Sequence, residues 1–178
     1  MRIIKITDIK ESDLPLIVLA DDRRGFTGWV IKHFGGNYNH SMEMHKLTHF
    51  ASQNFSGFKE VPVEEYLKPS ITLKFWKCKD VTTEQKENWL ADIKFELSEP
   101  WWKRRYDYFG IFGQLLSKVH PKLRVLNNPW AKFCSERVRD RIFKVLSIYL
   151  LSHLSPAELN SEFKTNQRME VFGYIMED

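Results

Sequence analysis

Residues 128–143 read NPWAKFCSERVRDRIF, and the predicted architecture depends on how this stretch folds. From Cys134 onward, apolar residues recur at the spacing of one helical face, as Val138 and Ile142 illustrate, while the arginines mostly fall elsewhere. The pattern predicts an amphipathic helix that begins at or near Cys134. Such a helix buries its apolar face against another element, so the remaining sequence should supply a partner surface.

Short apolar runs on the N-terminal side predict a sheet as that surface. LPLIVLA (14–20) is typical of a buried strand, and ITLKFWKC (71–78) alternates in the way of a second strand. Residues 37–62, punctuated by Gly57 and Pro62, suit two or three strands in a meander. We therefore expect an α+β fold with a curved, mainly antiparallel sheet of five or six strands, against which the Cys134 helix packs.

Two further helices carry recognisable start signals. Thr82 and Gln85 form a capping-box pattern before a helix with apolar residues at fourfold spacing. Ser155 and Glu158 repeat that pattern, with Pro156 at the first helical position. Both helices should begin at these residues.

Length and composition limit the possible classes of protein. The chain has 178 residues, of which 43% are hydrophobic and 28% charged, so we expect one folded domain spanning residues 1–178. The net charge of +4 is modest, and the densest basic run, Lys103–Arg105, is short. Nucleic acid is therefore an unlikely partner, whereas peripheral contact with a membrane stays open.

The cysteines and the apolar segments bear on the compartment. Cys78 and Cys134 lie far apart, and no apolar stretch of signal-peptide length opens the sequence. The longest apolar run, residues 145–154, is too short to cross a bilayer. We expect reduced thiols in a cytoplasmic protein, with phage association or delivery as an alternative.

The position of Cys134 suggests chemistry. The N–H groups and the dipole at a helix N-terminus favour a thiolate, but a reactive cysteine also needs a base and a group that orients the base. His40, at the start of a predicted strand, is a candidate base, and His49, on the next strand, could hydrogen-bond its ring. Two other interpretations stay open: a buried structural cysteine, and a zinc site built from Cys134, His40, His45 and His49.

Five segments in order resemble the circularly permuted papain-like amidases, the YiiX-like branch of the NlpC-type cysteine hydrolases. These segments are GFTGWVIKHFGGNYNHSMEM (25–44), THFASQ (48–53) with FKEVPVEEYL (58–67), YDYFG (106–110), FCSERV (133–138) and LSPAEL (154–159). Together they span most of the chain. The sequence departs from the family after the histidine, where Ser41, Met42 and Glu43 replace the usual apolar residues.

The resemblance implies a papain-like fold and a Cys-His-His triad. Cys134 would be the nucleophile, His40 the general base and acid, and His49 the residue that fixes the His40 tautomer. Tyr106 would line the substrate cleft. The reaction would be hydrolysis or acyl transfer at an amide, thioester or ester bond of an acyl- or peptide-containing substrate, without a cofactor or metal. The alternative is a catalytically inactive binding module on the same fold.

Overall fold

The computed structural model describes residues 2–22, 37–54, 56–105, 134–151 and 154–176. Within these ranges its strands are β1 (Leu16–Asp22), β2 (His40–Lys46), β3 (His49–Asn54), β4 (Gly57–Pro62), β5 (Ile71–Cys78) and β6 (Met169–Met176). The α-helices are α2 (Thr83–Ser98), α4 (Cys134–Leu146) and α5 (Pro156–Thr165). Short 3-10 turns are η1 (Ile6–Asp8), η2 (Glu11–Asp13), η3 (Val63–Glu65) and η4 (Trp101–Arg104).

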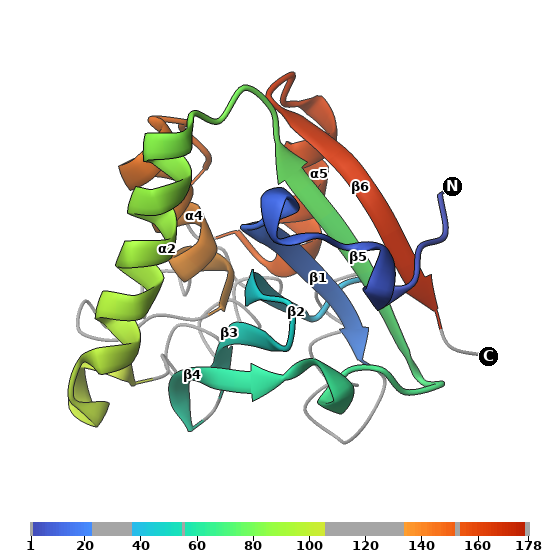
Figure 1. Cartoon of the computed structure of the whole chain (residues 1–178), viewed down its shortest axis with the longest axis horizontal. Coiled ribbons are helices and arrows are strands. Elements are labelled where there is room, and N and C mark those ends of the chain that lie inside the picture. Colours follow the sequence, from blue (N-terminus) through green and yellow to red (C-terminus); the bar gives the residue numbers. More distant parts are fainter. Residues whose placement is uncertain (1, 23–36, 55, 106–133, 152–153, 177–178) are drawn as a thin grey trace, which may run out of the picture.

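The strands form one antiparallel sheet in the order β4-β3-β2-β1-β5-β6 (Figure 1). In the middle of β1, Val18 lies opposite Met42 of β2 and Phe75 of β5. The expected α+β class and the antiparallel sheet are confirmed. The predicted meander is also confirmed, and it consists of three strands, β2 to β4.

The three helices pack on one face of this sheet, and α2 and α4 lie side by side (Figure 1). Their shared core includes Ile17, Trp89 and Ile142. The opposite face is covered by N-terminal residues, among them Ile4 and Ile9, and by residues 63–67. Because fully burying one such side chain contributes about 1.5–3 kcal/mol, both faces stabilise the fold.

Strand β5 is buried on both faces, so Lys74, a polar residue in its alternating pattern, also lies in the interior. Lys74 Nζ donates to Asn160 Oδ1 of α5 at 2.9 Å and lies 4.1 Å from the ring centroid of Trp76. These contacts replace part of the hydration that the ammonium group loses.

Strand β6 was not predicted from the sequence. It pairs with β5 and receives the N-terminal segment, because Ile4 N donates to Tyr174 O at 2.9 Å. Among the described helices, none has the length and apolar character needed to span a membrane.

Candidate functional site

Helix α4 places Cys134 in its first turn, as the sequence predicts. The Cys134 side chain is buried, with 3% of its surface exposed, and the neighbouring Ser135 Oγ donates to the carbonyl oxygen of Leu154. The helix packs on β2 with its apolar residues Val138 and Ile142 in the core. The thiol therefore lies between the start of a helix and the middle of the sheet.

The hydroxyl of Ser41 in β2 is a polar neighbour of that thiol. Burial raises the pKa of Cys134, and the Ser41 hydroxyl together with the N–H groups of Ser41, Ser135 and Cys134 lowers it only in part. The expected effect of the helix-terminal N–H groups is thus present, but burial outweighs it. The pKa of Cys134 is therefore raised, in the direction opposite to the one expected from the helix start alone.

His40, the first residue of β2, belongs to a chain of hydrogen bonds that continues through residues of β3. Its Nε2 lies 2.7 Å from Ser52 Oγ, and Ser52 Oγ donates to Asn54 Oδ1 at 2.8 Å. Because the hydroxyl proton goes to Asn54, Ser52 Oγ accepts from His40 Nε2–H. The tautomer with the proton on Nε2 leaves Nδ1 as the basic nitrogen.

The surroundings of His40 keep its ring neutral. Burial lowers the pKa of His40 to about 4, although the carboxylate of Asp22 raises it in part. The ring of Tyr66 stacks on the imidazole with 6.1 Å between centroids and 7° between planes. At neutral pH the site holds an uncharged imidazole that can accept a proton at Nδ1.

His49 does not lie beside His40. It pairs with Lys46 at the far end of the β2–β3 ladder, and its Nδ1 contacts Thr48 Oγ1 at 2.9 Å. The predicted contact between the two histidines is wrong, because the strands turn immediately before His49 and the hairpin register carries Ser52 back toward His40. Counting residues around the hairpin, rather than choosing the next histidine, could have identified Ser52.

The expected contact between Cys134 and His40 is also not formed. No hydrogen bond joins the two side chains in the part of the chain that the structure describes. Consecutive strand residues point to opposite faces, so Ser41 approaches α4 whereas His40 points toward Ser52 and Tyr66. The thiol therefore lies near the residue that follows His40 in β2, and the imidazole of His40 points away from it.

Other sequence candidates have different outcomes. Tyr106 lies outside the described residues. Cys78 is buried, and its Sγ donates to Met169 Sδ at 3.4 Å, in line with a structural role. Across the described ranges, no group of three or more His, Cys, Asp or Glu side chains has the arrangement of a metal site.

The basic run around η4 makes contacts within the protein. Lys103 pairs with Glu99 at 2.7 Å, Arg104 donates to the carbonyl of Phe58 at 3.1 Å, and Arg105 lies 4.5 Å from the ring centroid of Trp101. Because each cation already has a partner, the run is not a stripe of free positive charge.

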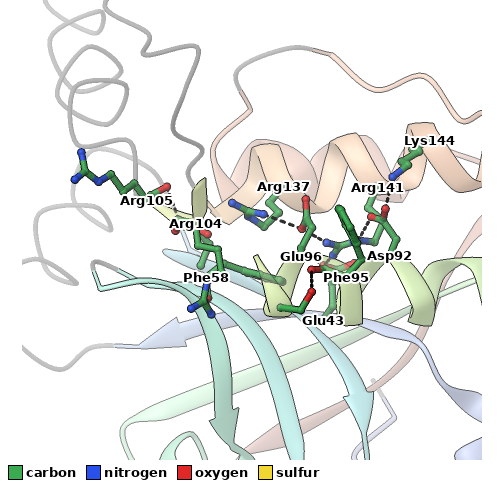
Figure 2. A network of polar contacts seen from close by, with 12 residues as sticks. Glu43, Phe58, Asp92, Phe95, Glu96, Arg104, Arg105, Arg137, Arg141 and Lys144 are labelled. Carbon is green, nitrogen blue, oxygen red and sulfur yellow. Dashed lines mark hydrogen bonds and ion pairs between the residues drawn. The ribbon is translucent and has the colours of Figure 1, made fainter. Parts of the chain in front are cut away.

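A buried charge network joins α4 to β2 and α2, and sequence reasoning missed it (Figure 2). Arg141, only 1% exposed, donates from Nε to Asp92 Oδ2 at 2.9 Å and also pairs with Glu43 and Glu96. Trp89 Nε1 donates to Glu43 Oε1 at 2.7 Å. Arginine satisfies several carboxylates at once because its guanidinium carries donors in a planar fork.

Glu43 is the residue of strand β2 that takes part in this network. Burial raises the pKa of Glu43 to about 7, while the charge of Arg141 and the Trp89 N–H oppose that effect. Glu43 follows Ser41 by two residues, so both side chains point to the α4 face of β2. Ser41 and Glu43 therefore place two polar groups against helix α4.

Searches of protein-family models and of curated proteins found no match to this chain.

Proposed function

We propose that the protein is a cysteine-dependent hydrolase or acyltransferase on a permuted papain-like fold. Cys134 is the nucleophile, His40 is the general base and acid, and Ser52 takes the orienting role that the sequence assigned to His49. The observation that carries this proposal is the hydrogen-bond chain from His40 Nε2 through Ser52 Oγ to Asn54 Oδ1. A chain of this kind fixes a tautomer and leaves one basic nitrogen available for catalysis.

The order of elements supports the same proposal. The histidine strand β2 precedes the cysteine helix α4 in the chain, and α4 packs on β2. This order agrees with the permuted arrangement that the sequence resembles.

The reaction follows from these groups. His40 Nδ1 takes the thiol proton as Cys134 Sγ attacks the acyl carbonyl, and a tetrahedral oxyanion forms. The N–H groups at the start of α4 stabilise that oxyanion. As it collapses, His40 gives the proton to the leaving group, and water or an acyl acceptor then releases Cys134. Because Ser41 approaches Cys134 and His40 points to the other face of β2, the step requires the strand end or the start of α4 to move until Sγ and Nδ1 come within hydrogen-bond reach.

The substrate class comes from the resemblance alone. We propose an amide, thioester or ester bond in an acyl- or peptide-containing molecule. Cys78 and Cys134 are both free thiols, which supports the proposal of a reducing, cytoplasmic compartment.

The first experiment is alkylation of the native protein with iodoacetamide as a function of pH, read by mass spectrometry at each cysteine. We expect Cys134 to react in the native protein and to react more slowly in His40→Ala and Ser52→Ala. Cys78 is the internal control, because burial raises its pKa to about 12. Equal rates at Cys134 in all three proteins would contradict the proposed roles of His40 and Ser52.

A second candidate function is a non-catalytic binding module. The low exposure of Cys134 and the missing contact with His40 favour it. On this alternative, Cys134 should be as inert as Cys78, and a screen of p-nitrophenyl esters and acyl thioesters should give no turnover that depends on Cys134.

A further inference from the structure

We propose that Ser41 is a catalytic residue whose hydroxyl donates a hydrogen bond to the Cys134 sulfur when that sulfur carries negative charge. This inference rests on the proposed function, because it takes Cys134 as the nucleophile. The proton of the thiol goes to His40 Nδ1, and Ser41 keeps its own proton throughout. Ser41 thus stabilises the negative charge on the Cys134 sulfur and transfers no proton.

The first observation is an unsatisfied hydroxyl. Ser41 is 1% exposed, and its Oγ has no hydrogen-bond partner among the described residues. An unpaired polar group in the interior is costly, so buried hydroxyls in proteins are nearly always paired. A hydroxyl that persists unpaired beside a thiol suggests that its partner is present only during the reaction.

The second observation is where the hydroxyl points. Ser41 shares a face of β2 with Glu43, and Glu43 binds Arg141 of α4. Ser41 is therefore directed toward the first turns of the same helix. Its hydroxyl lies near enough to Cys134 to oppose in part the rise that burial causes in the pKa of the thiol.

The third observation concerns the neighbour of Ser41 on β3. Continuing the β2–β3 register from the Met42–Ser52 pair brings Gln53 opposite Ser41, and Gln53 Nε2 donates to the carbonyls of Arg104 and Arg105 at 3.2 and 2.9 Å. Gln53 Oε1 is buried and unpaired as well. Gln53 thus fixes η4 beside the Ser41 position, and it offers no donor that could replace the Ser41 hydroxyl at the sulfur.

Burial opposes a negative charge on the Cys134 sulfur, so the thiolate needs a hydrogen-bond donor such as the Ser41 hydroxyl. The N–H groups at the start of α4 supply part of the stabilisation, and they do not overcome burial. The hydrogen bond from the Ser41 hydroxyl is stronger when the sulfur is a thiolate, since hydrogen bonds to charged groups are stronger than those between neutral groups. Ser41 would therefore act mainly when His40 has taken the proton.

The test measures the ionisation of Cys134 directly, without a substrate. The protein is labelled with ¹³C at cysteine Cβ, and the chemical shifts of Cys134 and Cys78 are followed by NMR as the pH rises, in the native chain and in Ser41→Ala. We expect Ser41→Ala to raise the pKa of Cys134 by about one unit, a tenfold loss of thiolate at a given pH. The Cys78 titration should not move.

A shape-matched pair guards against a folding defect. Ser41→Thr keeps the hydroxyl, and Ser41→Val has the same shape without it. Cys134 should therefore titrate in Ser41→Thr almost as in the native protein, and in Ser41→Val almost as in Ser41→Ala. Identical Cys134 titrations in Thr and Val, with native-like spectra, would overturn the proposal, as would an unchanged titration in Ser41→Ala.

The same data separate this inference from the proposed function. If Ser41→Ala shifts the titration but no substrate is turned over, the hydroxyl stabilises a thiolate in a protein that is not a hydrolase. If Cys134-dependent turnover exists and is equal in Ser41→Thr and Ser41→Val, the hydrolase stands and Ser41 has no catalytic role.

Discussion

The side chain of His40 is held in one tautomer by Ser52 and in the uncharged state by burial. Its pKa of about 4 lies below the 6.5 of an exposed histidine. Between these two values the unfolded chain binds a proton that the folded protein does not. The free energy of unfolding should therefore decrease as the pH falls from 6.5 to 4.

His40→Asn removes this titration and should flatten that part of the pH dependence. The measurement is urea denaturation of both proteins at pH 7, 5.5 and 4.5, followed by far-UV circular dichroism. Stability curves that run parallel from pH 7 to 4.5 would show that His40 titrates normally in the folded state.

The choice between His49 and Ser52 shows what a sequence can and cannot reveal at this scale. Cys134 and His40 were identifiable because each sits at the start of an element that has a clear pattern. Ser52 was not chosen, because a serine is not an obvious partner for an imidazole and its position depends on the turn before His49. The hydrogen-bond partner of His40 is thus defined by strand register rather than by residue type.

At the level of elements, α4 is held on the sheet by Arg141 as well as by apolar packing. Removing one partner of a buried ion pair leaves uncompensated charge and typically costs 3–5 kcal/mol. Lys144 on the same helix also pairs with Asp92, but its side chain is exposed. The two residues form a matched comparison of a buried and an exposed cation on one helix.

Arg141→Ala should lower the free energy of unfolding by about 3–5 kcal/mol, and Lys144→Ala by about 0–1 kcal/mol. Urea denaturation followed by tryptophan fluorescence gives both values. Similar losses in the two variants would mean that the buried network does not hold the helix in the way described.

Local signals predicted the helix starts correctly. Thr82 Oγ1 accepts from Gln85 N at 3.1 Å, and Ser155 Oγ accepts from Glu158 N at 3.3 Å, so both capping boxes are confirmed. Such motifs involve residues three positions apart and are readable from sequence. The Glu43–Arg141 pair spans 98 positions, which is why the same reasoning could not find it.

Thr82→Ala should cost about 1 kcal/mol in the free energy of unfolding, the usual effect of losing an N-cap. Thr82→Asn, which retains a side-chain oxygen acceptor, should recover most of that loss. Chemical denaturation of the three proteins side by side measures both effects, and equal stability of Thr82→Ala and the native chain would speak against a stabilising cap.

For the whole molecule, the sheet separates two apolar cores. Ile4 belongs to the core beneath the N-terminal residues, and Leu159 belongs to the core under the helices. If residues 1–178 form one domain, as expected from the chain length, both cores should melt together.

Ile4→Ala and Leu159→Ala should each cost about 2–5 kcal/mol and shift the midpoint of a single unfolding transition. Tryptophan fluorescence and far-UV circular dichroism should report the same midpoint in each variant. Two separable transitions, each sensitive to one substitution, would mean that the chain folds as two units.

The order of the strands has a consequence for synthesis of the protein. Strands β1 to β4 pair with their neighbours in sequence, so they can form a hairpin ladder as soon as the first third of the chain leaves the ribosome. Helix α4, which brings Cys134 and Arg141 to β2, emerges far later. A growing chain therefore displays Ser41 and Glu43 without their partners until residues 134–146 have been synthesised.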